Sequence, residues 1–131
     1  MGFLEGLDFD DVIEPKAVPE GEYELRVIEV TQNVNKNNEP YIMPRFEIAS
    51  EPTAKEVSKY MALPINSMDE KRMNRTKLNL KRFFDAMGVD ISGGVDLDAL
   101  KGETVWAILG LEEDDEYGEQ NFIKRFVQPG Q

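Results

Sequence analysis

Apolar and polar residues alternate in a long stretch near the beginning of the chain, which predicts a β-strand over residues 22–34. Leu25 and Val27 share one face of this stretch, and the apolar phase then moves to Ile28 and Val30. A change of phase inside one strand is what a β-bulge produces, because a bulge inserts an extra residue. We therefore predict a long first strand that bends near its middle.

Residues 41–49 alternate in the same way, after a turn that the composition predicts at residues 35–39. Pro44 lies inside the second stretch, two residues before the apolar Phe46. Because proline has no N–H to donate, we expect this strand to lie at an edge of the sheet or to carry a bulge at Pro44. A third strand is predicted over residues 57–63, with a phase that the pattern does not determine.

Apolar residues then recur at steps of three and four from Met73 to Met87, which predicts an amphipathic helix. Ser67 and Glu70 have the spacing of a capping box, so we expect the helix to begin after Ser67. Gly88 is expected to end it as a left-handed cap.

The polar face of this helix concentrates positive charge. Projected at 100° per residue, Lys71, Arg75 and Arg82 lie opposite the apolar stripe. A solvated helix face is the simpler interpretation, and contact with a polyanion is the alternative. The twelve residues 71–82 contain no acid and six bases, namely Lys71, Arg72, Arg75, Lys77, Lys81 and Arg82.

Two more strands are predicted after the helix, over residues 103–112 and 120–127. A short helical turn is expected at residues 96–102, and the strongly acidic residues 113–118 form the turn between the two strands. The carboxylates of that turn could be interpreted as a Ca²⁺ site, but they lack the spacing of an EF-hand loop.

Composition excludes several classes of chemistry. The chain has no His and no Cys, so it cannot build a Ser-His triad, a Cys-His pair, a disulfide or a His- or Cys-ligated zinc site. We therefore expect a protein that is not an enzyme and needs no cofactor or metal. The absence of Cys is consistent with a reducing cytoplasm, and no apolar run is long enough to span a membrane.

The order of predicted elements, three strands, one helix and two strands, is that of the OB-fold, a mainly β, five-stranded barrel with one main helix. We expect this domain over residues 21–127, with an acidic N-terminal arm at residues 1–20 and a short tail at 128–131. OB-folds bind oligonucleotides or oligosaccharides on the face of strands 2 and 3 and through the loops 1–2 and 4–5.

The chain also resembles a family of phage-encoded, single-stranded DNA-binding OB-fold proteins, largely catalogued as a domain of unknown function. That resemblance implies sequence-tolerant binding of single-stranded DNA during phage replication or recombination, in the cytoplasm of the bacterial host. It covers nearly the whole chain and rests on VPEGEYELRVIEV (18–30), EPYIMPRFEI (39–48), LKRFFDAMGVD (80–90), DLDALKGETVWAIL (96–109) and EYGEQNFIKRFV (116–127).

Binding single strands without reading bases requires exposed aromatic rings for stacking and cations for phosphates. Tyr41 and Arg45 lie out of phase with the core positions of their strand, so they are the leading pair. Lys124 and Arg125 are expected on opposite faces, so at most one can reach a groove. The candidate DNA-binding residues are Lys36, Tyr41, Arg45, Lys55, Lys59, Tyr60, Trp106, Tyr117, Phe122 and Lys124.

The net charge of −11 argues against a simple nucleic-acid binder, which usually carries a basic surface. The alternative interpretation is a protein-binding β-barrel that recruits a basic partner without binding nucleic acid. The acidic arm could also recruit replication or recombination proteins. The sequence leaves open whether the chain forms a homodimer and whether Lys71, Arg75 and Arg82 contact DNA.

Overall fold

The computed structural model describes residues 2–128 and is mainly β, with one α-helix and a six-stranded antiparallel sheet. Along the path β3-β2-β1-β5-β6, neighbouring strands are hydrogen-bonded, and β4 also pairs with β2. The strands are β1 (Gly21–Val34), β2 (Pro40–Ile48), β3 (Val57–Ser58), β4 (Met61–Ala62), β5 (Thr104–Asp114) and β6 (Gly118–Phe126), with helix α1 (Glu70–Met87) and the 3₁₀ helix η1 (Leu97–Leu100) between β4 and β5.

Strand β1 is bulged where the change of apolar phase predicted a bulge. Its register with β2 shifts between Val27 and Glu29, which leaves Ile28 without a partner. Leu25, Val27 and Val30 are all buried, so the bulge keeps both halves of the strand facing the core. The prediction of a bent first strand is confirmed.

The third predicted strand is not continuous, and Pro44 supplies the reason. Strand β2 is internal to the sheet rather than an edge strand, because it pairs with β1 on one side and with β3 and β4 on the other. The pairs Arg45↔Ser58 and Ile42↔Met61 flank an interruption opposite Pro44. Since proline cannot donate to a ladder, the partner strand breaks there, and the bulge lies on β1 instead.

Helix α1 begins two residues later than the capping-box pattern predicted. Its N-cap is Asp69, whose carboxylate accepts a hydrogen bond from the backbone N–H of Arg72, so the prediction of Ser67 was wrong. Asp at the N-cap position accepts such a bond as well as Ser does, so the local pattern did not discriminate between them. Gly88 ends the helix in the left-handed conformation, with φ of 73°, as expected.

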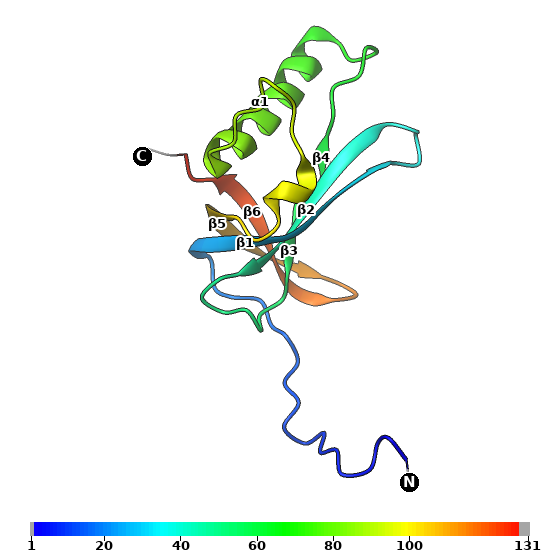
Figure 1. The fold of residues 1–131 in the computed structure, drawn as a ribbon, viewed down its shortest axis with the longest axis vertical. Coiled ribbons are helices and arrows are strands. Elements are labelled where there is room, and N and C mark those ends of the chain that lie inside the picture. The colour runs from blue at the N-terminus through cyan, green and yellow to red at the C-terminus, as the bar shows by residue number, and fades with distance from the viewer. Residues whose placement is uncertain (1, 129–131) are drawn as a thin grey trace.

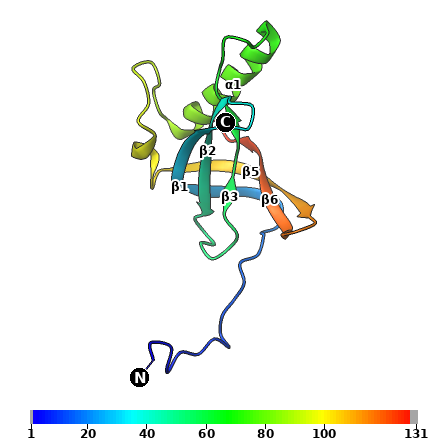
Figure 2. The same ribbon diagram turned by 90° about the vertical axis from the view of Figure 1, so that its right-hand side faces the viewer.

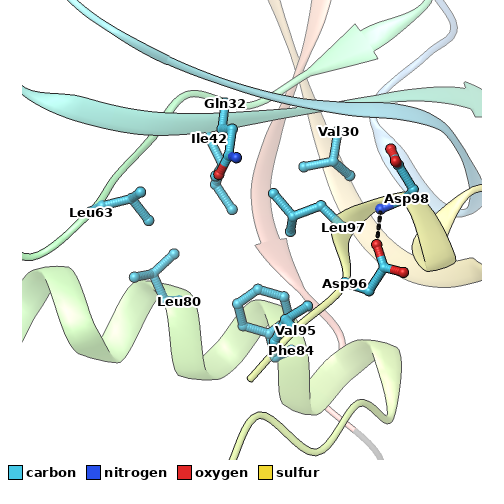
Figure 3. Close-up of a pocket in the computed structure, with 10 residues that line it drawn as sticks. All are labelled: Val30, Gln32, Ile42, Leu63, Leu80, Phe84, Val95, Asp96, Leu97 and Asp98. Carbon is cyan, nitrogen blue, oxygen red and sulfur yellow. Dashed lines mark hydrogen bonds between the residues drawn. The ribbon is translucent and has the colours of Figure 1, made fainter. Parts of the chain in front are cut away.

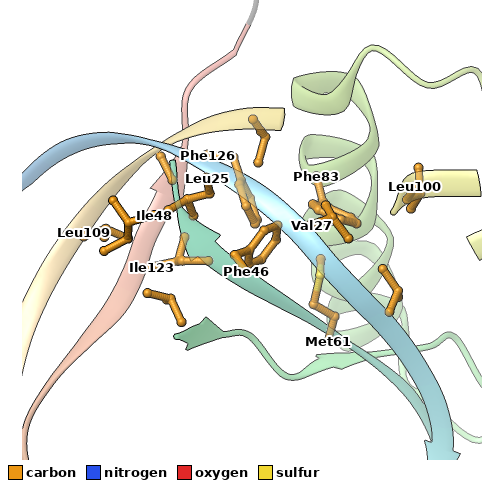
Figure 4. Close-up of a cluster of buried hydrophobic side chains, with 14 of the residues drawn as sticks. Leu25, Val27, Phe46, Ile48, Met61, Phe83, Leu100, Leu109, Ile123 and Phe126 are labelled. Atoms are coloured by element: carbon orange, nitrogen blue, oxygen red, sulfur yellow. The ribbon is translucent and has the colours of Figure 1, made fainter. Parts of the chain in front are cut away.

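An aromatic cluster joins the helix to the two halves of the sheet (Figure 4). The ring of Phe83 on α1 lies 6.4 Å from that of Phe46 on β2 and 5.1 Å from that of Phe126 on β6. Phe46 and Phe83 are fully buried. Aromatic pairs at these separations add to the stabilisation that burial provides, so this cluster holds α1 over one end of the sheet (Figure 1).

The sheet curves strongly without closing (Figure 2). Its two ends, β3 and β6, contact each other, but no hydrogen-bonded ladder joins them among residues 2–128. Chain segment 16–18 bridges this gap instead. The backbone N–H of Lys55 donates to the carbonyl oxygen of Lys16, and the side chain of Asn121 both accepts from the N–H of Val18 and donates to its carbonyl oxygen.

The N-terminal segment therefore has two parts. Val18 is buried and joined to β6, whereas no hydrogen bond or ion pair within residues 2–128 connects residues 2–15 to the rest of the chain. Figure 1 shows the first part extending away from the end of the sheet opposite α1. Residue 1 of the predicted arm lies outside the described residues. Over residues 2–20 the arm makes no hydrogen bond or ion pair with the fold in its acidic portion, where only Ile13 and Glu14 lie beside residues 50–54, and it is docked at its base.

Replacing Asn121 with Ala should lower the free energy of unfolding by roughly 1–3 kcal/mol, because it removes the hydrogen bonds of the Asn121 side chain to the N–H and carbonyl of Val18 and to the carbonyl of Gly110. Urea denaturation measures the change. Gln120→Ala is the matched control, since the Gln120 side chain makes no hydrogen bond within the described chain. A loss no larger than that of the control would show that the bridge does not stabilise the fold.

Candidate nucleic-acid interface

The outer face of β2 carries the leading candidates because the inner face is filled. Ile42, Pro44 and Phe46 are buried, so Tyr41 and Arg45 must project from the opposite face. Figure 2 looks toward β2 and β3, with β1 on one side and β6 on the other. The alternation of the sequence predicted this placement correctly.

Tyr41 and Tyr60 form an aromatic pair on this outer face. Their ring centroids are 4.6 Å apart and their planes are inclined by 32°. Tyr60 remains 48% exposed, so its ring is accessible to a ligand. Sequence periodicity could not place Tyr60 on a face, since the interruption opposite Pro44 removes the regular phase between β3 and β4.

The β1–β2 turn supports this pair. The side-chain amide of Asn35 donates to the Tyr60 hydroxyl at 3.1 Å, and its carbonyl oxygen accepts from the N–H groups of Asn37 and Glu39. Asn38 adopts φ of 62°, the left-handed conformation that Asn tolerates in turns. One side chain therefore links the conformation of the turn to the position of the Tyr60 ring.

The cations near this pair differ in availability. Arg45 lies between two carboxylates, 3.6 Å from Glu29 and 3.4 Å from Glu56. Lys36, in the turn, and Lys59, beside Tyr60, have no ion pair within residues 2–128. A phosphate could approach these two lysines directly, but it would compete with carboxylates for Arg45.

Lys55 has a structural contact that the sequence did not indicate. Its ammonium donates to the carbonyl oxygens of Tyr117 and Glu119, at 2.7 and 2.8 Å. An ammonium has three donors, so two of them already hold the β5–β6 hairpin against the β2–β3 connection. This lysine joins the two ends of the sheet, beside the bridge that residues 16–18 make.

Tyr117 lies in the β5–β6 turn and is 62% exposed. The Asp114 carboxylate orders this turn by accepting hydrogen bonds from the backbone N–H groups of Glu116 and Tyr117. The Tyr117 N–H, then the Glu116 N–H, hold the pKa of Asp114 below its ordinary value, because they stabilise the carboxylate. The sequence identified this turn by composition but not the residue that orders it.

Trp106 lies on the outer face of the sheet, but in a different region. It pairs with Glu24 on β1, whereas Tyr41 pairs with Asn33 on the same strand. Those positions are nine residues apart, or about 30 Å of extended strand. Trp106 is half exposed, and the structure does not bring it to the Tyr41–Tyr60 pair.

Phe122 and Lys124 lie on β6, which pairs with β5, the strand that carries Trp106. The Phe122 ring covers Gly110, where a Cβ atom would meet it at 2.4 Å, and the Lys124 ammonium lies 3.8 Å from the Glu20 carboxylate. The expectation that Lys124 and Arg125 lie on opposite faces was wrong. A register shift between β5 and β6 leaves both exposed, between the buried Ile123 and Phe126.

Two features near α1 were not predicted. Arg72 reaches the β1–β2 turn, 3.5 Å from Glu39, so one helix base faces the candidate surface while Lys71, Arg75 and Arg82 are exposed elsewhere on the helix. An open depression of about 480 Å³ lies between α1, β1, β2 and residues 95–98 (Figure 3). It is lined by Val30, Gln32, Ile42, Leu63, Leu80, Phe84, Val95, Asp96, Leu97 and Asp98.

The part of the chain that the structure describes contains no group of three or more Asp or Glu side chains placed to hold a metal ion. Nor does this part contain a helix with the length and apolar character needed to cross a membrane.

A protein-family model with the description "Protein of unknown function (DUF669)" matches residues 6–128. No curated protein matches the chain. The family match begins inside the acidic arm and ends just after β6, so it includes the arm, the candidate surface and the helix with its cluster of bases.

The amide proton shifts of Glu116 and Tyr117 should titrate with an apparent pKa below 3.8, the ordinary value for Asp. The pKa of Asp114 is lower in the folded protein than in the unfolded chain, so its carboxylate stabilises the fold fully when the pH is above the ordinary Asp pKa. That stabilisation is lost as the pH falls through the lowered pKa of the folded protein. NMR titration checks this, with Asp114→Asn as the control that should abolish both transitions. Titration at or above the ordinary value would contradict the role of Asp114.

Proposed function

We propose that this chain, which belongs to the family described as "Protein of unknown function (DUF669)", binds single-stranded DNA without sequence preference. The observation that carries the proposal is the pair of rings formed by the partly exposed Tyr41 and the exposed Tyr60, 4.6 Å apart on the outer face of β2 and the interrupted β3–β4 strand. Stacking a base on an aromatic ring contributes about 1–3 kcal/mol and tolerates any base, because every base has a π-face.

The connectivity supports an OB-type arrangement for this proposal. Strand β1 lies between β2 and β5, the edges β3 and β6 contact each other, and α1 precedes β5. In OB-folds the ligand lies on the face of strands 2 and 3, between the loops 1–2 and 4–5. The corresponding elements here are β2 with β3 and β4, the turn at residues 35–39, and the turn at residues 115–117.

The charges around the aromatic pair define how a single strand would be held. Lys36 and Lys59 would contact phosphates directly, while Arg45 would exchange Glu29 and Glu56 for phosphate oxygens. Because the rest of the chain is strongly acidic, binding depends on local potential and should weaken steeply with salt. On this proposal the protein coats single strands during phage DNA replication or recombination.

A second candidate function, binding of a protein partner, is favoured by the depression in Figure 3. Its floor is apolar, and the exposed carboxylates of Asp96 and Asp98 lie at one side. A partner that inserts an apolar side chain flanked by a base would fit this chemistry. In that case Leu97→Glu would abolish partner binding and leave the affinity for oligonucleotides unchanged.

The experiment that tests the main proposal is a fluorescence-anisotropy titration with oligo(dT), a duplex and a single-stranded RNA of equal length. We expect oligo(dT) to bind more tightly than the duplex, because only unpaired bases can stack on the rings. Equal or tighter binding of the duplex would overturn the proposal, and the RNA arm measures the preference for DNA.

Tyr41→Ala should weaken binding of oligo(dT) by roughly 1–3 kcal/mol, about 5- to 150-fold in Kd, with little change in Tm because the ring lies outside the core. The matched control is Trp106→Ala, which removes another half-exposed aromatic ring from a distant part of the same face. An unchanged Kd for Tyr41→Ala, or an equal loss for the control, would contradict the assignment of the stacking surface.

A further inference from the structure

The free part of the N-terminal arm is both acidic and apolar. Residues 2–14 contain five acids and no base, namely Glu5, Asp8, Asp10, Asp11 and Glu14. The same stretch exposes six large apolar side chains, from 55% for Leu7 to 104% for Phe3. Apolar side chains gathered in this density on an exposed surface usually mark an interaction site.

Helix α1 presents a surface with complementary charge. Lys71, Arg75 and Arg82 lie on one line along the exposed side of the helix, with Leu78, which is 38% exposed, between them. None of these three bases has an ion pair within residues 2–128. The basic face of α1, defined by these four residues, carries no acid.

An apolar groove of about 460 Å³ adjoins this basic face. Pro64, Leu80 and Val89 contribute to its lining, as do Lys77 and Lys81, which lie on the side of α1 toward the basic face. Asp85 and Asp90 also line the groove, and Asp85 is neutralised by Lys81 at 2.6 Å. A ligand that combines apolar side chains with several negative charges suits this pair of surfaces better than it suits the depression beside Asp96 and Asp98.

The arm and the helix lie at opposite ends of the fold (Figure 1). The base of the arm is held at residues 16–18 by Lys55 and Asn121, and the arm extends away from α1 in both views (Figures 1 and 2). Thirteen extended residues span at most about 45 Å, which suffices to reach across a neighbouring molecule. The direction of the arm therefore favours contact with a second copy.

We propose that residues 2–14 of one copy bind the basic face and the adjoining groove of α1 on the next copy. The acids pair with Lys71, Arg75 and Arg82, while Phe3, Leu4, Leu7 and Phe9 cover Leu78 and enter the groove. The contact is heterologous, because arm and helix are different surfaces, so it joins copies head to tail in a closed ring or an open chain. If the chain also binds single strands as proposed above, this contact would align neighbouring copies along one strand and make their binding cooperative.

Charge reversal of the full-length chain tests this contact. One variant combines Asp8→Lys, Asp10→Lys and Asp11→Lys, and a second combines Lys71→Glu, Arg75→Glu and Arg82→Glu. We expect the wild-type protein to associate at about 0.1 M salt and to dissociate at about 1 M salt, where the Debye length falls from about 10 Å to about 3 Å. Each variant alone should sediment as the 14.9 kDa monomer, and an equimolar mixture should associate again, because each reversed surface meets its complement.

The control variant combines Lys101→Glu, Lys124→Glu and Arg125→Glu, which changes the net charge as the Lys71, Arg75 and Arg82 variant does but at bases outside the basic face of α1. It should associate as the wild type does, and circular dichroism should be native for all variants. A wild-type protein that stays monomeric at low salt, a mixture that fails to associate, or a control that dissociates equally would each overturn the proposal.

Oligo(dT) titration of the same variants separates this inference from the proposed function. If the Lys71, Arg75 and Arg82 variant loses DNA binding while its self-association is unchanged, the basic face binds phosphates and the arm contact is overturned. If no variant binds oligo(dT) but the mixture still restores association, the arm contact stands and the DNA-binding proposal fails. Cooperative binding by the wild type that is lost in both variants and recovered in the mixture would support the two together.

Discussion

Strand β1 pairs with β5 through residues 21–26 and with β2 through residues 25–34, and the bulge at Ile28 lies close to the point where the two ladders separate. One continuous strand can serve both ladders only if it bends while its buried side chains stay on the inner face. The bulge meets that requirement, because it resets the alternation between Val27 and Val30. The curvature of the sheet, and the outer face on which Tyr41 and Tyr60 lie, both follow from this bend.

The ends of the curved sheet are joined without a strand ladder. Phe46, Phe83 and Phe126 fill the core beneath α1, while residues 16–18, Asn121 and Lys55 bridge β3 and β6 at the other end of the molecule. The polar bridge uses the side-chain amide of Asn121 and the ammonium of Lys55 to satisfy backbone groups that a closed barrel would pair between strands. It also determines where the free arm leaves the fold, which is why the arm and α1 face in opposite directions.

Charge is distributed unevenly over this framework. Carboxylates lie beside Arg45, Arg72, Lys81 and Lys124, whereas Lys71, Arg75 and Arg82 on the exposed side of α1 have no acidic partner within residues 2–128. An acidic protein with locally unpaired cations can bind a polyanion or an acidic segment only where those cations gather, and the acidic remainder limits the affinity. The candidate stacking surface and the basic face of α1 are the two regions where that condition holds, and they suit different ligands.

The sequence by itself determined the elements, because periods of two and of three to four residues reflect which side of a strand or helix is buried. It located the long strands, the bulge in β1, the cap at Gly88 and the outward direction of Tyr41. Only the tertiary structure decided that β3 and β4 are separate, that Asp69 caps α1, and that Lys55 and Asn121 join the sheet ends. It also decided that Tyr60 lies beside Tyr41 while Trp106 does not. The cap is a local contact between Asp69 and Arg72, which the pattern missed because Ser67 and Asp69 are equally good N-cap residues. The other features depend on contacts between residues far apart in the chain, and local periodicity carries no information about which distant groups meet.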